Sequence, residues 1–157
     1  MASLRVYVPT YSGASNVAEL VLYAEGVEYE SALVDGDLDY SLLIADIWAR
    51  GEGFALVEHD VAPWVGALSE LASCEEDWCM FRYAKGGGLS RGVGCTKFSE
   101  RLVREYPDLP DAWRGTHWDM IDGAVGSPVA AVLRAEAPER VLPCYHTPSL
   151  AHARGPD

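Results

Sequence analysis

The sequence predicts a single α/β domain with an open, mostly parallel sheet and helices on both of its faces. The first observation is the order of the segments, because short apolar runs alternate with amphipathic ones in a β-α-β-α-β-α pattern through residues 1–75. The second is the length, since 157 residues suit one compact domain. The third is the composition, which at 49% hydrophobic and 23% charged is that of an ordinary globular protein. We therefore expect residues 1–157 to form one domain.

Three strands and three helices account for the first half of this domain. Residues 5–9 form an apolar strand that stops at a proline, and Ser15 can cap the helix that follows. The run Phe-Ala-Leu-Val at residues 54–57 is apolar throughout, as in a parallel strand covered on both faces. In chain order, we expect strands over residues 5–9, 29–34 and 54–57, alternating with helices over residues 16–25, 39–50 and 65–73.

The second half is less regular. A flexible loop at Gly86-Gly87-Gly88 can close over a ligand, with Lys85 and Arg91 among the few cations available to meet phosphate. Two short helices are expected on either side of a break at Gly126-Ser127-Pro128. The expected elements are a strand over residues 78–83 and helices over residues 99–106, 119–125 and 129–135, followed by a tail at residues 141–157.

Charge and cysteine content narrow the function classes. Twelve basic and 24 acidic residues give a net charge of −12, which repels phosphates, so we expect no broad nucleic-acid-binding surface. No apolar run is long enough for a membrane span and no secretory signal is recognisable, which predicts a cytoplasmic protein. For the cysteines we expect buried reduced thiols, with a zinc site or a disulfide as alternatives. They are Cys74, Cys79, Cys95 and Cys144.

Carboxylates follow two of the predicted strands. Glu58-His59-Asp60 comes directly after the apolar run, and strand geometry would place Glu58 and Asp60 on one side and His59 on the other. Two adjacent carboxylates at a buried strand end repel unless a cation or a shared proton intervenes, and oxygen ligands suit Mg²⁺ or Mn²⁺. The alternative is that they cap the turn before Pro63. Asp35-Gly36-Asp37 competes for the metal role, or is a plain loop, or accepts hydrogen bonds from a nucleobase or ribose.

These motifs together resemble a known family. The order of Pro9-Thr10-Tyr11 after a strand, Asp35-Gly36-Asp37 after the next, and then the segment Phe54–Pro63 resembles glycosyltransferases of the A-type fold. The similarity is closest to the large inverting family that uses nucleotide-diphosphate sugars, and it continues through Gly94–Ser99 to cover residues 4–125. In one departure, Glu58 replaces the first aspartate of the family motif.

The resemblance implies a minimal form of this Rossmann-like fold, about one αβ unit shorter than usual. Residues 1–75 would be the nucleotide-binding half, residues 76–140 the acceptor and catalytic half, and residues 141–157 the tail. It also implies a cofactor, Mn²⁺ or Mg²⁺, and a partner, a nucleotide-diphosphate sugar donor. The acceptor stays open between a protein, a modified base and a glycan.

Site residues carried over from the resemblance fall into three groups. Those of the nucleotide pocket are Pro9, Thr10, Tyr11 and Asp35, with Glu58 assisting through the ribose or a water. Those of the metal shell are Asp60, Glu58 and a C-terminal histidine, His152 or His146. The candidates for the base that deprotonates the acceptor hydroxyl are Asp122 and Asp119, which lie three residues apart. Trp113 and Trp118 are candidates for a sugar contact, whereas Trp48 continues an apolar helix face and belongs to the core.

The resulting hypothesis is a metal-dependent, hexosyltransferase-like enzyme that transfers a sugar with inversion. One alternative is a nucleotide- or sugar-binding module without catalysis. The other is a metal-dependent phosphohydrolase or nucleotidyltransferase that uses the same carboxylates.

Overall fold

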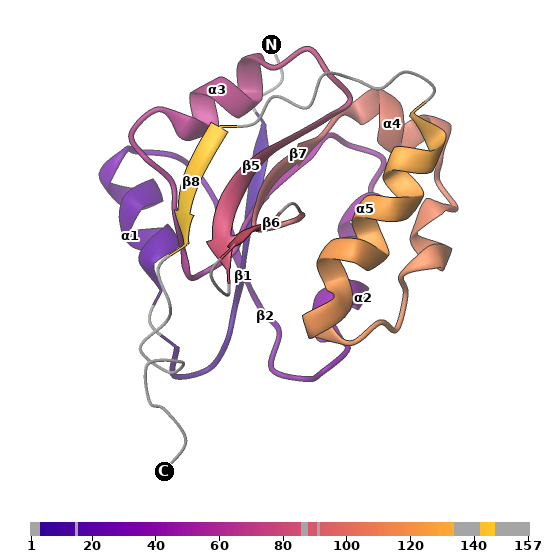
Figure 1. Ribbon diagram of the computed structural model, residues 1–157, viewed down its shortest axis with the longest axis horizontal. Helices are drawn as coiled ribbons and strands as arrows, with labels where there is room; N and C mark the ends of the chain where they lie inside the picture. The colour runs from indigo at the N-terminus through magenta and orange to yellow at the C-terminus, as the bar shows by residue number, and fades with distance from the viewer. Residues whose placement is uncertain (1–3, 15, 86–87, 91, 134–141, 147–157) are drawn as a thin grey trace.

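The computed structural model describes residues 4–14, 16–85, 88–90, 92–133 and 142–146, and Figure 1 shows how they are arranged. The fold is a single α/β domain, in which one sheet separates two groups of helices. The strands are β1 (Arg5–Thr10), β2 (Glu30–Leu33), β3 (Phe54–Val57), β4 (Val61–Ala62), β5 (Trp78–Lys85), β6 (Gly88–Ser90), β7 (Cys95–Phe98) and β8 (Leu142–His146). The helices are α1 (Val17–Ala24), α2 (Asp39–Trp48), α3 (Ala67–Ser73), α4 (Glu100–Glu105) and α5 (Ile121–Val132), with 3₁₀ turns η1 (Leu109–Ala112) and η2 (Trp118–Met120).

The sheet is mixed rather than mostly parallel. Its strand order is β2-β1-β3-β7-β5-β8-β4, with β6 paired to β5. Strands β1, β2 and β3 are parallel neighbours, as the alternating pattern of the first half predicts. Strand β7 is antiparallel to both β3 and β5, and β4 and β6 are antiparallel to their partners. The prediction was wrong for the second half because β5, β6 and β7 follow one another without the crossover helix that parallel neighbours need.

Alternation along the strands produces two cores, one on each face of the sheet. Val6 and Val8 of β1 face the core covered by α1 and α3, whereas Tyr7 faces the core covered by α2, α4 and α5. The strand β3 is buried along its whole length and divides its side chains in the same way. Figure 1 shows the two groups of helices on opposite sides of the sheet, which confirms that helices cover both faces. Trp48 is 1% exposed and belongs to the second core, as predicted.

Two helices differ from the expected ones in their details. Helix α1 begins after Asn16, whose side chain accepts from the Glu19 N–H at 2.9 Å, so Asn16 rather than Ser15 is the cap. Helix α5 is continuous through Pro128, where a break was expected. A proline inside a helix costs about 3 kcal/mol. Burial of Ile121, Val125 and Val129 offsets that cost, since each fully buried side chain stabilises by about 1.5–3 kcal/mol.

Part of the predicted tail belongs to the sheet. Leu142–His146 forms β8, which is parallel to β5 and antiparallel to β4. In the predicted glycine-rich loop, Gly88 opens β6, which pairs with β5. Gly86, Gly87 and Arg91 lie outside the described residues. Within the described part of the chain, no helix is long and apolar enough to cross a membrane.

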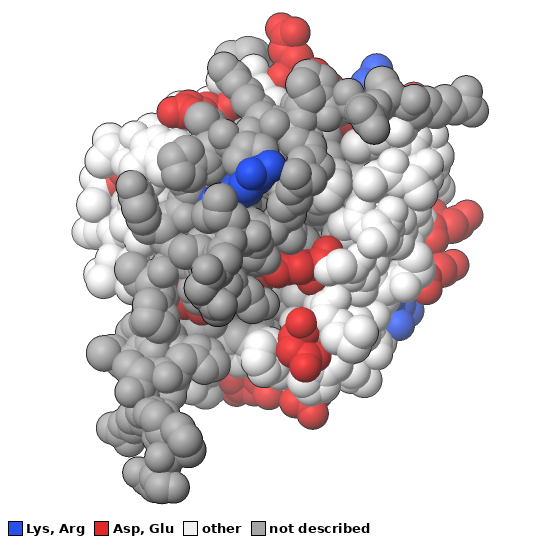
Figure 2. Space-filling view, viewed as in Figure 1, with Lys and Arg blue, Asp and Glu red and all other residues white. Residues whose placement is uncertain are grey.

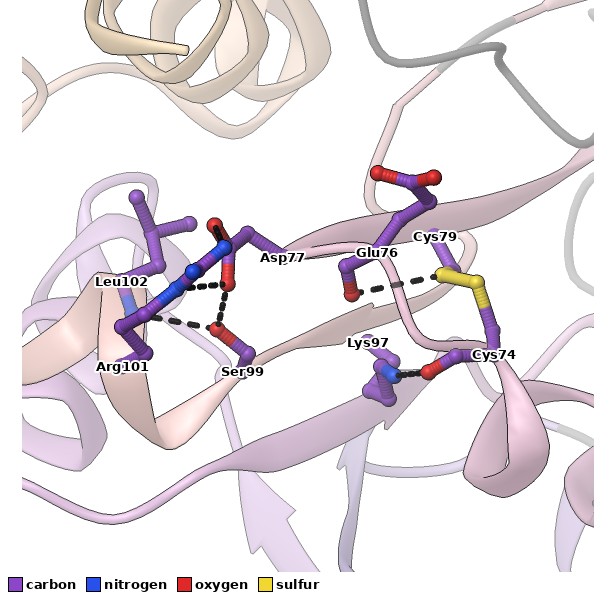
Figure 3. Close-up of polar contacts among 8 residues, drawn as sticks. All are labelled: Cys74, Glu76, Asp77, Cys79, Lys97, Ser99, Arg101 and Leu102. Atoms are coloured by element: carbon purple, nitrogen blue, oxygen red, sulfur yellow. Dashed lines mark hydrogen bonds and ion pairs between the residues drawn. A yellow bond between two sulfur atoms is a disulfide. The ribbon is translucent and has the colours of Figure 1, made fainter.

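The connection between α3 and β5 is held by a disulfide and a polar cluster (Figure 3). Cys74 and Cys79 form the disulfide, so the expectation of reduced thiols was wrong for this pair, whereas Cys95 is buried and reduced, as expected. Lys97 on β7 is 7% exposed and its Nζ donates to the Cys74 carbonyl. Burial lowers the pKa of Lys97 below its usual value, and the nearby carboxylate of Asp77 offsets this only in part.

Asp77, immediately before β5, joins this connection to helix α4. Its carboxylate accepts from the Ser99 hydroxyl and from the Arg101 guanidinium, and its carbonyl accepts from the Ser99 N–H at 2.7 Å. The hydrogen bond from Arg101 is the main reason that the pKa of Asp77 lies below its ordinary value. Ser99 in turn caps α4 by accepting from the Leu102 N–H at 3.0 Å. A single carboxylate thus ties the disulfide loop to the next helix.

Candidate functional site

The carboxyl ends of β1, β2 and β3 meet at one edge of the sheet, the lower edge in Figure 1, because the three strands are parallel neighbours. Strand β7 runs the other way, so the segment Gly92–Gly94 that precedes it lies at the same edge. The Glu58 N–H donates to the Gly94 carbonyl at 2.8 Å, which holds the end of β3 against this segment. Open α/β sheets bind ligands beyond the carboxyl ends of their strands, so this edge is the candidate site.

Asp35 closes the site on the β2 side. Its two carboxylate oxygens accept from the Ser12 N–H at 2.7 Å and from the Ser12 hydroxyl at 2.6 Å. These two hydrogen bonds lower the pKa of Asp35 and keep it ionised. A carboxylate offers about four lone-pair positions, so Asp35 can hold the β1 loop and still accept from a ligand. The role of Ser12 was missed, because in the sequence it is one hydroxyl in a small polar loop.

Glu58, His59 and Asp60 form a tight turn between β3 and β4. The Val61 N–H donates to the Glu58 carbonyl at 3.0 Å, which closes the turn. Their position at the carboxyl end of a strand confirms the prediction, and they lie in a turn rather than within the strand itself. His59 and Asp60 are both buried, at 5% and 7% exposure, and Glu58 is half-buried.

The ring of Tyr11 is packed against this turn. It meets the His59 ring edge to face, with the centroids 5.1 Å apart. The pKa of Tyr11 is raised to about 12, first by burial and then by the negative charges of Glu58, Asp60 and Asp35. All three carboxylates thus contribute to raising the pKa of the same phenol, so the negative charge at the strand ends acts on Tyr11. Pro9, the first of the predicted pocket residues, is buried within β1, whereas Thr10 is half-buried.

The donor groups here suit a divalent cation that a ligand helps to hold. Among the described residues, no three His, Cys, Asp or Glu side chains come together as a protein-only metal site. Magnesium, however, is commonly held by one or two carboxylates together with substrate phosphates. Glu58 and Asp60 can supply two such carboxylates. His152 lies outside the described residues, and His146 is the last residue of β8, with only its backbone described.

Asp122, at the start of α5, reaches the same edge. One of its oxygens, Oδ1, accepts from the Val93 N–H at 2.9 Å. The carboxylate packs directly on Gly92, where a Cβ would lie only 2.0 Å from that oxygen and 2.6 Å from the Cβ of Asp122. Since Gly94 in turn accepts from Glu58, this short segment connects Asp122 to the end of β3. The importance of Gly92 was missed, because in the sequence it is one glycine among several nearby.

Asp119 has different partners, so the two aspartates are not brought together as a pair. It lies in η2, and its Oδ1 is 2.6 Å from Nδ1 of His117. The other ring nitrogen of His117, Nε2, is 3.7 Å from Oδ1 of Asp37. Trp118 is 39% exposed, which fits a surface contact. Trp113 is fully buried beside Trp48, so the suggestion that it touches a sugar was wrong.

Acidic side chains dominate the neighbourhood of this edge. In Figure 2 acidic side chains lie between the sheet and α5 and along the lower border, near the edge at which β1 and β2 end in Figure 1. This agrees with the net charge of −12. A diphosphate would approach this edge only with a cation that offsets the repulsion.

Comparison with known proteins shows the fold and little beyond it. No protein-family model matches the chain, and no curated protein sequence matches it. The structure is similar to the crystal structure of A197 from STIV, with a TM-score of 0.61 and 13% sequence identity over 93% of this chain and 82% of that chain. It is also similar to a glycosyltransferase involved in the glycosylation of the major capsid of PBCV-1, with a TM-score of 0.49 and 11% identity over 92% of this chain and 82% of that one. The first likeness establishes a shared fold alone, and the second is too distant to carry an argument.

Proposed function

We propose that this protein is a metal-dependent glycosyltransferase, hexosyltransferase-like, that moves a sugar from a nucleotide-diphosphate sugar to an acceptor hydroxyl with inversion. The observation that carries the proposal is that the strands before Asp35 and before Glu58 and Asp60 are parallel neighbours of β1 and end at the same edge, where Tyr11 packs against His59. The fold would be a minimal version of the A-type fold, with its nucleotide-binding half in residues 1–75 and its acceptor half in residues 76–140. The proposed compartment is the cytoplasm.

The nucleotide would lie along the ends of β1 and β2. Tyr11 offers a half-buried ring for the nucleobase, and Asp35, ionised and fixed by Ser12, accepts from the base or the ribose. Asp60 and Glu58 would hold Mn²⁺ or Mg²⁺, with His152 as a further candidate ligand. The metal, when bound, would neutralise charge on the departing diphosphate.

Asp122 is the preferred base. Its Oδ1 accepts from the Val93 N–H at 2.9 Å, which holds the carboxylate beside the segment that precedes β7. In the proposed step, the acceptor proton passes to Asp122 while the acceptor oxygen bonds to the anomeric carbon. The bond from that carbon to the diphosphate oxygen breaks, and the diphosphate leaves with the electron pair. Asp119 is the second candidate, but its carboxylate is engaged with His117.

Calorimetry with UDP, GDP and dTDP, each with and without Mn²⁺, tests the donor site. We expect at least one nucleotide to bind more tightly with the metal, and Asp60→Asn to remove most of that gain, because Asp60 is the proposed main ligand of the metal and Glu58 assists. Glu58→Gln should have the milder effect. The matched control is Asp108→Asn, an exposed aspartate beyond α4, which the Trp48–Tyr106 hydrogen bond places at the opposite edge of the sheet. Equal affinities with and without metal in every variant would contradict the proposed metal site.

Hydrolysis of the matching nucleotide sugar, with water as the acceptor, tests the chemistry. The proposed reaction releases a nucleoside diphosphate and a free sugar of inverted anomeric configuration, which ³¹P and ¹H NMR identify. A phosphohydrolase or nucleotidyltransferase would instead cleave within the diphosphate, and a binding module would release nothing. Asp122→Asn should leave nucleotide binding intact and lower the rate by about 10² or more. Full activity in Asp122→Asn with an inactive Asp119→Asn would exchange their roles.

A further inference from the structure

Asp37, His117, Trp118 and Asp119 form one continuous surface, which we call the Trp118 surface. The Trp118 N–H donates to the Asp37 carbonyl at 3.0 Å, which brings η2 against the loop that follows β2. The ring of His117 lies beside the indole, with centroids 5.6 Å apart and planes tilted by 35°. Trp118 is thus held through its backbone and on one side of its ring, and the residue is still 39% exposed.

The polar groups around this ring are arranged as hydrogen-bond acceptors. His117 contacts Asp119 through Nδ1 and lies near Asp37 through Nε2. The side chains of Asp37 and Asp119 are nevertheless 75% and 58% exposed, so most of their lone pairs face the solvent. An exposed aromatic face with carboxylates at its border therefore presents an apolar platform and several acceptors to one ligand. Met120, which is 66% exposed, extends the apolar part.

We infer that the Trp118 surface binds a saccharide, and that this saccharide supplies the acceptor hydroxyl. A sugar ring has an apolar C–H face that packs on an indole, and its hydroxyl groups donate to carboxylates. A phosphate ligand does not fit, since two carboxylates would repel it and the chain carries a net charge of −12. A neutral polyol meets neither difficulty.

The position of this surface agrees with an acceptor role, and this part of the inference rests on the proposed function. Asp37 lies two residues after Asp35, the proposed nucleotide ligand, and Trp118 lies four residues before Asp122, the proposed base. The surface thus extends from the end of β2 to the start of α5. A saccharide held there lies beside the nucleotide site, with the base at one end of its platform.

Saturation-transfer NMR and calorimetry on the full chain test the inference without donor or metal. The probes are four neutral trisaccharides, built from glucose, galactose, mannose or N-acetylglucosamine, and one lysine-rich peptide. We expect at least one trisaccharide to bind, Trp118→Ala to weaken it by roughly tenfold, and Trp118→Phe to keep part of the affinity. The matched control is Tyr23→Ala, which removes an 81% exposed aromatic ring on α1 and should change nothing.

The possible outcomes separate this inference from the proposed function. Absence of binding by all four trisaccharides, or equal affinity in wild type and Trp118→Ala, would overturn it. Binding of the peptide alone, lost at ~0.5 M salt, would assign the surface to a cationic partner and also overturn it. Saccharide binding that depends on Trp118, in a protein that binds no nucleotide, would sustain the Trp118 surface and reject the glycosyltransferase. Metal-dependent nucleotide binding without saccharide binding would do the reverse.

Discussion

Removing the Cys74–Cys79 disulfide should lower the free energy of unfolding by about 2 kcal/mol. The two cysteines are five residues apart, and closing so short a loop restricts the unfolded chain by that amount in the loop-entropy model. For a chain of this length, 2 kcal/mol corresponds to a fall in Tm of roughly 4–8 °C. A second, local effect is expected at Lys97, since its ammonium donates to the Cys74 carbonyl and loosening the loop would admit water to it. The pKa of Lys97 should then rise toward its usual value.

Thermal and urea unfolding of the wild type, with and without a phosphine reductant, measure this effect. The matched control is the double variant Cys74→Ala and Cys79→Ala, whose Tm the reductant should leave unchanged. Thiol counting on the unfolded protein must show two additional thiols after reduction. If those thiols appear and the Tm of the wild type does not move, the loop-entropy reasoning fails. If the untreated protein already has four thiols, the disulfide itself is absent.

Three further predictions concern the edge of the sheet. Gly92→Ala should lower the free energy of unfolding, measured by urea unfolding, by about 1–3 kcal/mol, because the new Cβ displaces the Asp122 side chain from Val93. The control is Gly123→Ala in α5, whose Cβ would meet nothing within 4 Å and which should be neutral or stabilising. An unchanged urea midpoint in Gly92→Ala would contradict the close contact. Because a raised pKa means that the folded state keeps the Tyr11 proton, stability should fall as pH rises from 10 towards 12, and Tyr11→Phe should reduce that fall. Absorbance at 295 nm, with Tyr11→Phe as the reference, should show a lower Tyr11 pKa in Asp60→Asn; an unchanged value would mean that Asp60 does not act on this phenol.

The first half of the fold could be predicted because its segments carry local signals. A short apolar run such as residues 54–57, with glycines before it and polar residues after it, is typical of a buried strand. The segments on either side have the apolar periodicity of helices. The second half could not be predicted in the same way. The direction of β7 depends on its neighbours in the sheet, and β4 is a two-residue strand that depends on its pairing with β8. Pro128 is a strong local signal against a helix, but the burial of Val125 and Val129 outweighs it.

The candidate site was predictable in its residue types and not in its contacts. Strand ends followed by carboxylates identified Asp35, Glu58 and Asp60, because parallel strands deliver their carboxyl ends to one edge. The contacts that decide what these groups can do are tertiary. Ser12 binds Asp35 across 23 residues, and Val93 binds Asp122 across 29 residues. The sequence analysis favoured reduced thiols over a disulfide because the chain has only four cysteines. The spacing of Cys74 and Cys79 in the sequence does not show whether their sulfur atoms meet. A disulfide is uncommon in the reducing cytosol, and the cytoplasmic compartment stays a prediction.

The contact between Gly92 and Asp122 has a consequence for how this chain can change over evolutionary time. The carboxylate occupies the space that a side chain at position 92 would need, so position 92 cannot gain a side chain without a loss of stability while Asp122 is present. A mutation that adds a Cβ at Gly92 becomes tolerable only after Asp122 has been shortened or lost, and regaining the acid then requires the glycine first. We therefore expect the two positions to vary together in homologous sequences. A glycine–aspartate pair at this spacing would mark the chains that keep the α5 carboxylate at the strand ends.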